Sequence, residues 1–162
     1  MIGNDIVDLA LARKENNWKR KGFLEKVFTP KEQLLISNAI NPEVMVWNLW
    51  SRKEAAYKIY NRATQMRAFI PLRLVCHYEN ETLGSVTCNG NTYFTQTNIT
   101  DDFIHSIAVV KKEYFNAIKS LNSKVKVNKI NGIPFIIDER TKIRKPVSIS
   151  HHGLFWEGIA LD

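Results

Sequence analysis

Apolar and polar positions divide this chain into a helical first part and a strand-rich second part. Residues 2–7 have the alternation of a short strand, and residues 8–21 form a cation-rich helical pattern that Gly22 would end. A third helical pattern runs from Asn41-Pro42 to about Asn61. The first part therefore predicts a strand followed by several helices.

Between these helical patterns lies a clear helix start. Thr29 and Glu32 have the spacing of a capping box, in which each side chain bonds the backbone of the other. Pro30 stands at the first helical position, where its missing N–H costs nothing. This combination predicts a helix from Pro30 to about Ala39.

After about Leu72 the period changes to that of strands, with turns rich in Asn, Gly and Asp. A short helix is expected around residues 112–121 and a hairpin near residues 130–136. The predicted strands cover residues 72–78, 84–88, 92–97, 103–110, 147–153 and 155–161. With 162 residues and no long linker, we expect one domain, residues 1–162, of the α+β class: a mainly antiparallel sheet with helices packed on one face.

Three polar or aromatic side chains fall on one stripe of the predicted third helix. Trp50, Glu54 and Lys58 recur at every fourth position, so they lie one above another. A Glu followed four residues later by a Lys is also a common solvent-side pair worth only a few tenths of a kcal/mol. The residues left to face the core are Leu49, Ala56, Ile59 and Tyr60.

Two other segments carry polar groups where packing residues are expected. Asp5 interrupts the apolar pattern of the first strand, two residues after Gly3, which lets a ligand or another backbone come close. The segment Val147–Gly153 offers two hydroxyls and two imidazoles, a set suited to binding phosphate. Each segment also has a plain alternative, since an acid at a strand end can cap a helix and a histidine pair in a turn is usually solvated.

Taken together, these segments resemble the 4'-phosphopantetheinyl transferases, and most of all the short holo-acyl-carrier-protein synthase type. The order of the motifs is the same, although residues 66–130 carry none. The matching segments are Gly3-Asn4-Asp5-Ile6, Phe28-Thr29-Pro30-Lys31-Glu32, Trp50-Ser51-Arg52-Lys53-Glu54-Ala55 with Lys58, and Ser148-Ile149-Ser150-His151.

The resemblance implies transfer of the phosphopantetheine arm of coenzyme A to a serine of an apo carrier protein, with adenosine 3',5'-bisphosphate released. Asp5 and Glu54 would hold Mg²⁺, which typically takes one or two carboxylates, several waters and substrate phosphate. Glu54 or a metal-bound water would remove the serine proton. Lys58 would neutralise the transferred phosphoryl group, and Lys53 would contact a coenzyme A phosphate.

Further roles follow from the same resemblance. Ser150 and His151 would grip the nucleotide end of coenzyme A at its 3'-phosphate. Arg13 and Lys14 would stand in for the carrier-facing arginine of the first helix.

The chain also departs from the family pattern. Val7 occupies the place of a second acid in the longer enzymes, so a three-carboxylate metal site is not expected. Asp8 is expected to start a helix rather than to bind metal. A glycine-bearing loop after the Lys-Glu-Ala helix is replaced by residues 61–65.

Composition fits such an enzyme. A net charge of +7 and a pI near 9.5 indicate an acidic partner, and both acyl carrier proteins and coenzyme A are acidic. Cys76 and Cys88 match neither a disulfide framework nor a zinc site and are expected to be buried free thiols. With no apolar run long enough for a membrane span and no signal peptide, we expect a cytoplasmic protein without a membrane or nucleic-acid partner.

Two rival classes follow from the same residues. A basic nucleic-acid-binding protein without catalysis would explain the charge, but it gives no reason for Asp5 and Glu54. A degenerate family member that binds without turnover is disfavoured by Glu54 and Lys58. The cations that motivate the nucleic-acid alternative are Lys124, Lys126, Lys129, Arg140, Lys142, Arg144 and Lys145.

A weak internal similarity between two segments bears on the oligomeric state. Residues 97–110 run strand, polar turn, strand, much as residues 148–161 do, although any two hairpins share this order. The longer transferases are built of two similar halves, whereas the short ones resemble one half and form trimers with sites between subunits. The resemblance therefore leaves a homotrimer and a monomer open.

Overall fold

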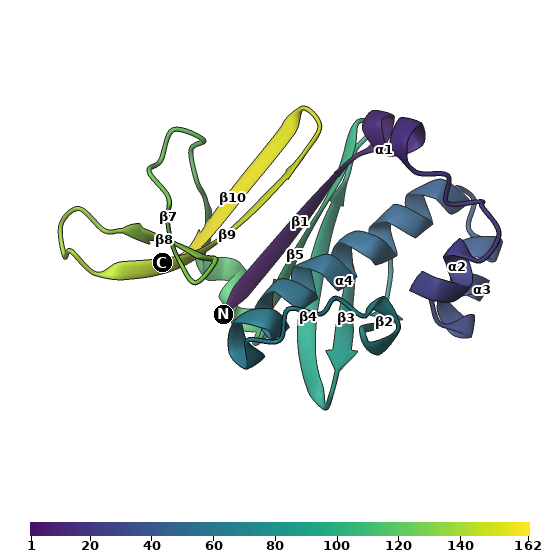
Figure 1. The fold of residues 1–162 in the computed structure, drawn as a ribbon, viewed down its shortest axis with the longest axis horizontal. Coiled ribbons are helices and arrows are strands. Elements are labelled where there is room, and N and C mark those ends of the chain that lie inside the picture. The colour runs from purple at the N-terminus through teal and green to yellow at the C-terminus, as the bar shows by residue number, and fades with distance from the viewer.

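The computed structural model describes residues 1–162 and contains two five-stranded antiparallel sheets with helices on one side (Figure 1). The α+β class is confirmed, but the single expected sheet is two. The helices are α1 Leu9–Glu15, α2 Phe23–Val27, α3 Pro30–Asn38 and α4 Pro42–Thr64, with 3₁₀ turns η1 Pro71–Arg73 and η2 Lys112–Ala117. The strands are β1 Ile2–Asp8, β2 Val75–Tyr78, β3 Leu83–Cys88, β4 Asn91–Ile99, β5 Phe103–Val109, β6 Ile118–Ser120, β7 Asn128–Ile130, β8 Ile133–Ile137, β9 Arg144–His152 and β10 Phe155–Leu161.

The first sheet has the strand order β1-β5-β4-β3-β2, and α4 packs across it, mainly on β1 and β5. All four residues expected to face the core from this helix are buried. Full burial of Leu49 and Ile59 contributes roughly 1.5–3 kcal/mol each. The long α4 is thereby fixed beside β1, which sets Glu54 on the helix next to Asp5 on the strand.

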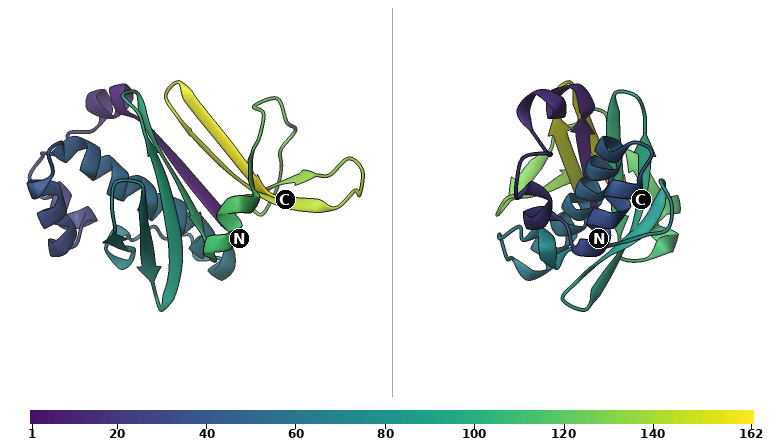
Figure 2. Two further views of the ribbon diagram at one scale, coloured as in Figure 1. Left: turned by 180° about the vertical axis from the view of Figure 1, so that it is seen from behind. Right: turned by 90° about the vertical axis from the view of Figure 1, so that its right-hand side faces the viewer.

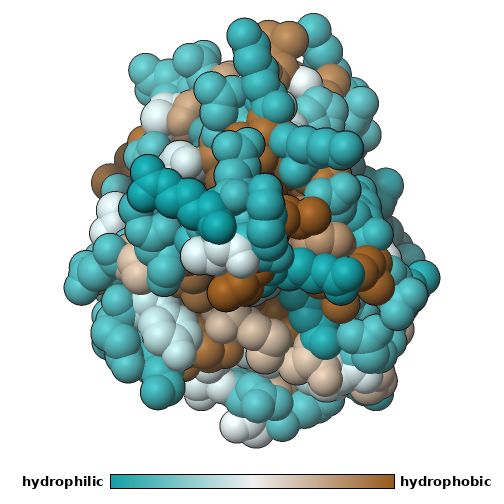
Figure 3. All heavy atoms as spheres, turned by 90° about the vertical axis from the view of Figure 1, so that its left-hand side faces the viewer, coloured by the Kyte–Doolittle hydropathy of each residue, from teal (hydrophilic) through white to brown (hydrophobic).

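The second sheet has the order β6-β10-β9-β8-β7, and β9 lies against β1 of the first sheet. Figures 1 and 2 show β9 running alongside β1, and the tip of the β9–β10 hairpin is held at the end of β1, where the N–H of Leu154 donates to Asp8 Oδ2 at 3.1 Å. The side on which β7 to β10 lie presents a mosaic of hydrophilic and hydrophobic side chains (Figure 3). β1, β9 and α4 all contribute residues to the cavity described below.

The helix predicted for residues 8–21 is wrong in length. α1 ends at Glu15, where Asn16 adopts an extended backbone, and a separate short helix, α2, follows. Gly22 does not end the first helix: it precedes α2 with φ of +82°, a left-handed backbone that favours glycine. Of the cations in this segment, Arg13 and Lys14 lie in the last turn of α1, whereas Lys19, Arg20 and Lys21 lie in the turns before α2.

Three other boundaries differ from the prediction. The helix expected to end at about Asn61 continues to Thr64, so most of residues 61–65, expected as a loop, are helical. The strand expected from residue 72 begins at Val75, since Pro71–Arg73 forms a 3₁₀ turn. The helix expected over residues 112–121 is a 3₁₀ turn that passes directly into β6 at Ile118, where the chain joins the second sheet.

Several local predictions are confirmed. Thr29 and Glu32 form the capping box of α3, and Asp8 caps α1 by accepting the N–H of Leu11 at 3.0 Å. Both cysteines are free and buried, and burial raises the pKa of the Cys76 thiol to about 12. That thiol is therefore inert at neutral pH.

Candidate active site

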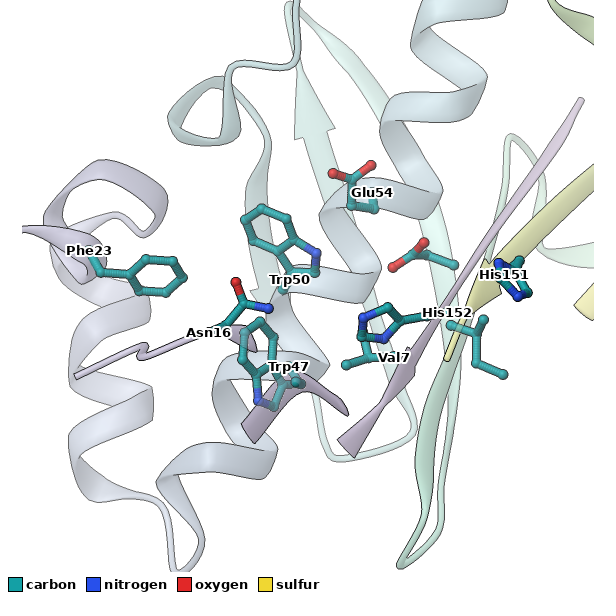
Figure 4. A pocket seen from close by; sticks show the side chains of 11 residues that line it. Val7, Asn16, Phe23, Trp47, Trp50, Glu54, His151 and His152 are labelled. Atoms are coloured by element: carbon teal, nitrogen blue, oxygen red, sulfur yellow. The ribbon is translucent and has the colours of Figure 1, made fainter. Parts of the chain in front are cut away.

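Asp5 on β1 and Glu54 on α4 face one cavity of about 260 Å³, which we call the carboxylate cavity. Figure 4 shows Glu54 and Trp50 of α4 around this cavity together with His152. One wall is aromatic, with Trp47 and Trp50 from α4 in edge-to-face contact at 6.5 Å between ring centroids. The remaining lining residues are Ile6, Val7, Ala12, Asn16, Phe23, His151 and His152. The cavity thus combines an apolar wall with a pair of acids.

Asp5 is held in place by two partners. Ser150 Oγ donates a hydrogen bond to Asp5 Oδ1 at 2.9 Å, and Lys58 Nζ lies 3.6 Å from the same oxygen. Burial nevertheless raises the pKa of Asp5, because loss of hydration outweighs the attraction of these partners. The carboxylate is therefore fixed in direction while its charge is only partly compensated.

Glu54 is the more perturbed of the two acids. Burial and the neighbouring charge of Asp5 raise the pKa of Glu54 to about 7, and the charge of Lys58 offsets this only in part. A carboxyl with a pKa near 7 exchanges protons readily at neutral pH, which suits a general base. Two crowded acids also provide the oxygen donors that a divalent cation prefers.

Lys58 joins the acids to the backbone. Its Nζ donates to the carbonyl of Asn4 at 2.6 Å and to that of Ile149 at 3.1 Å. An ammonium has three N–H donors, so one remains on the side of Asp5. Burial lowers the pKa of Lys58, while the two acids act in the opposite direction.

A second hollow of about 310 Å³ adjoins the first and shares His151 with it. Its cationic lining residues are Lys58, Arg62 and Lys129, and we call it the basic hollow. Gly132, Ile133 and Pro134 form its opposite side. A basic hollow beside an acid pair is suited to binding a phosphorylated substrate whose reacting phosphorus lies near the acids.

Lys53 does not lie at this site, contrary to the expectation that it contacts coenzyme A. Its side chain is fully buried, and Nζ donates to Glu32 Oε2 at 2.7 Å and to the carbonyls of Val27 and Pro71, each at 2.9 Å. All three N–H groups are used, so none is left for phosphate. Lys53 instead joins α4 to α3 and η1.

Ser150 and His151 lie next to each other but differ in access. The Ser150 hydroxyl is buried, accepts the N–H of Ile6 at 3.1 Å and donates to Asp5, so it orients an acid and is closed to a nucleotide. His151 is exposed and borders both hollows.

Arg13 and Lys14 lie on the exposed last turn of α1. Arg13 Nε donates to Glu43 Oε2 at 2.9 Å. Neither residue lines the carboxylate cavity, whose rim includes Ala12 and Asn16 from the same segment.

Sequence reasoning missed one site residue and gave no role to another. Arg62 lies one helical turn after Lys58, and this spacing could have revealed it. The sequence did mark His152 as half of a histidine pair, but only the structure shows its Nδ1 accepting the N–H of Asp8 at 2.8 Å while its ring lines the carboxylate cavity.

A first prediction concerns stability. Because the folded pKa of Glu54 lies above its ordinary value of 4.5, the folded state holds an extra proton between pH 4.5 and about 7. Binding of this proton stabilises the folded state fully below pH 4.5, and the stabilisation is lost as the pH rises through 7. Glu54→Gln escapes this loss, so we expect it to raise the free energy of unfolding at pH 8 by ~1–3 kcal/mol.

Urea unfolding at pH 8 and pH 4 measures this difference. The variant and the unmodified protein should have similar stability at pH 4. If the variant and the unmodified protein were equally stable at pH 8 as well as at pH 4, Glu54 would titrate normally in the folded protein.

Comparison with known proteins supports an enzyme of the transferase class. The family model described as ACPS, 4'-phosphopantetheinyl transferase superfamily, matches residues 1–110. A holo-[acyl-carrier-protein] synthase of Campylobacter jejuni (serotype O:6, strain 81116) is 30% identical over 114 residues, covering 67% of this chain and 96% of that protein. The chain therefore belongs to the 4'-phosphopantetheinyl transferase superfamily.

Other matches agree with this assignment. The synthase of a second Campylobacter jejuni strain, 81-176, is 40% identical over 57 residues, which cover 35% of this chain and 46% of that protein. The structure of Helicobacter pylori holo-[acyl-carrier-protein] synthase in complex with coenzyme A has a TM-score of 0.52 and 19% identity, with 67% of this chain and 98% of that chain covered. The structure of the Neisseria meningitidis synthase has a TM-score of 0.54 and 18% sequence identity, and the match covers 68% of this chain and 97% of that chain.

Two further findings concern the extent of the family match and the character of the helices. The segment Ser148–His151, on which part of the sequence resemblance rested, lies beyond the matched residues 1–110. None of the helices combines the length and the apolar character that crossing a membrane requires.

Proposed function

We propose that this protein transfers the 4'-phosphopantetheine arm of coenzyme A to a serine hydroxyl of an apo acyl or peptidyl carrier protein in the cytoplasm. The reaction would need Mg²⁺ and release adenosine 3',5'-bisphosphate. The observation that carries the proposal is the pairing of Asp5 and Glu54 in one cavity, with Lys58 leading from it into a basic hollow.

The residues present fit a Mg²⁺ ion. Asp5 and Glu54 approach closely enough for the charge of one to raise the pKa of the other, a repulsion that a divalent cation would relieve. Mg²⁺ needs only one or two protein carboxylates, and Asp5 and Glu54 would be these ligands. When bound, the ion would neutralise charge on the substrate phosphates.

The remaining steps depend on the side chains. Glu54 takes the proton from the carrier serine as the oxygen attacks phosphorus, a role open to a carboxylate that lines this cavity. Lys58 directs its third N–H toward the side of Asp5, where it offsets charge on the transferred phosphoryl group. Ser150 keeps the Asp5 carboxylate pointed into the site.

Coenzyme A is placed by the basic hollow. Lys129 and His151 are exposed there, and Arg62 and Lys58 add positive charge from α4. A 3'-phosphorylated nucleotide bound in this hollow would have its pyrophosphate next to Lys58 and its arm toward the carboxylate cavity. Displacement at phosphorus then depends mainly on positioning and charge neutralisation.

The carrier protein is expected to approach along α1. Lys14 is exposed and Arg13 is half-exposed, and both stand near the rim of the carboxylate cavity. Net positive charge steers an acidic carrier toward this side.

A second prediction follows for carrier binding. Reversing Arg13 and Lys14 to Glu should raise KM for the carrier protein roughly tenfold at low salt, because like charges now face the acidic partner. KM for coenzyme A should stay within about twofold. The same reversal at Lys124 and Lys126, two exposed cations far along the chain, is the matched control.

The assignment is contradicted if the two double variants change the carrier KM equally, or if KM for coenzyme A rises with it. Steady-state rates with each substrate varied in turn provide these constants.

The proposed reaction is tested by following coenzyme A with chromatography. Adenosine 3',5'-bisphosphate should form only when enzyme, apo carrier and Mg²⁺ are all present, and a chelator should stop it. Formation that is unaffected by chelator would remove Mg²⁺ from the proposal. Salt-sensitive binding of nucleic acid without any bisphosphate would favour the nucleic-acid alternative instead.

A further inference from the structure

Two hairpins of this chain are alike in sequence and in form. β5, Phe103–Val109, and β10, Phe155–Leu161, share Phe, Ile and Ala at the first, fifth and sixth positions. Each follows an antiparallel partner of nine residues, β4 and β9. The rings of Phe103 and Phe155 are in contact, with centroids 4.9 Å apart. Only the first hairpin lies within residues 1–110, which the family model matches.

The two hairpins use opposite edges of β1. β5 pairs with β1 through the backbone, whereas β9 approaches the other edge with side chains. Three N–H groups of β1 are accepted in this way, each by a residue 144 positions later, so β9 runs parallel to β1. The bonds are Asn4 N to Ser148 Oγ at 3.0 Å, Ile6 N to Ser150 Oγ at 3.1 Å, and Asp8 N to His152 Nδ1 at 2.8 Å.

The carbonyl groups along this seam are satisfied from α4. Arg62 donates to the carbonyls of Ile2 at 3.0 Å and Val147 at 2.6 Å, one on each strand. One helical turn earlier, Lys58 makes the corresponding pair of bonds to Asn4 and Ile149. Side chains therefore replace a backbone ladder between β1 and β9, and these polar groups of the seam are paired without backbone bonds between the two strands.

The second hairpin is also fixed by apolar packing. Ile2 of β1, Val109 of β5 and Ile159 of β10 form a small core in which each is at most 1% exposed. The connection is short, since only Val110 and Lys111 separate β5 from η2, which leads without a gap into β6 on the edge of β10. A short, packed connection leaves little freedom for the hairpin to dock on another copy.

We propose that the β9–β10 hairpin is an internal second copy of β4–β5 that occupies the free edge of β1, so that one chain completes its own active site. The first part supplies Asp5, Glu54 and Lys58, and the second hairpin supplies Ser150, which orients Asp5, and His151. The roles of these residues in catalysis rest on the proposed transfer, whereas the position of the hairpin on β1 within one chain does not. The protein then works as a monomer and needs no residue from a second copy.

Hydrogen exchange tests the assembly independently of activity. The amides of Asn4, Ile6 and Asp8 should be protected at a concentration where sedimentation gives the 18.7 kDa of one chain, and tenfold dilution should leave their rates unchanged. Ser150→Ala should speed exchange at Ile6 by at least about tenfold. Ser120→Ala, an exposed serine of β6, is the matched control. Free exchange of these amides in the monomer, or protection lost on dilution, would overturn the proposal.

Mixing of inactive variants tests where the site is completed. One chain carries Glu54→Ala, the other Ser150→Ala with His151→Ala, and both are co-expressed with different tags. The mixture should be no more active than the sum of its parts, even if the chains associate. Recovered activity would show that hairpins are shared between copies and contradict the proposal. If the unmodified protein transfers nothing, the proposed function fails and hydrogen exchange still decides the assembly.

Discussion

Glu54→Gln should lower kcat for phosphopantetheine transfer by ~10²–10⁴-fold, the range for loss of a general base. Glutamine keeps the shape of the side chain but neither accepts the serine proton nor carries the charge that a metal ion needs. Single-turnover transfer to an apo carrier measures the effect, with Glu139→Gln, at an exposed turn far along the chain, as the control.

Stability separates this effect from misfolding. The variant is expected to be at least as stable as the unmodified protein at pH 8, because it removes a buried charge that burial disfavours. A variant that transfers at a rate within about threefold of the unmodified protein would show that Glu54 is not the base.

Lys53→Met should destabilise the protein by ~3–5 kcal/mol, the usual cost of breaking a buried ion pair. The change leaves the Glu32 carboxylate buried without its cation and removes the donor to the carbonyls of Val27 and Pro71. Urea unfolding at pH 7 measures the difference. Lys31→Met, at an exposed lysine next to Glu32 on α3, should change stability by less than about 0.5 kcal/mol.

The same variant distinguishes a structural from a binding role. If Lys53 contacted coenzyme A, its loss would raise KM for coenzyme A and leave the unfolding midpoint unchanged. The buried position predicts the reverse: a lower midpoint, with KM for coenzyme A little changed in the fraction that remains folded.

Features set by local sequence could be predicted. The capping box of Thr29 and Glu32 and the cap at Asp8 involve groups three residues apart, so their geometry follows from the helix itself. The stripe of Trp50, Glu54 and Lys58 follows from the period of α4. These features put a carboxylate and a cation on one helix face before any tertiary structure is considered.

Other features depend on contacts between distant segments. Lys53 and Lys58 look alike in sequence, but Lys53 is covered by α3 and η1, whereas Lys58 points toward β1 and β9. The hydrophobic patterns of these segments do not show where each of them packs on α4. The role of Ser150 was misread for the same reason, since its acceptor Asp5 lies 145 residues away.

The separation into two sheets could not be predicted either. Each strand was recognisable, but the edge that β1 offers to β9 is closed by hydroxyls, an imidazole and two α4 cations rather than by backbone pairing. Strand patterns encode which face is buried, and they carry no information on side chains that replace a ladder.

Intact-mass analysis of an apo acyl carrier protein after incubation with coenzyme A, Mg²⁺ and this enzyme tests the central claim most directly. The carrier should gain the mass of one phosphopantetheine group, and the gain should disappear with chelator or with Glu54→Gln. An unchanged mass with fatty-acid, polyketide and peptidyl carriers alike would contradict the proposed transfer, although the fold and the carboxylate cavity would stand.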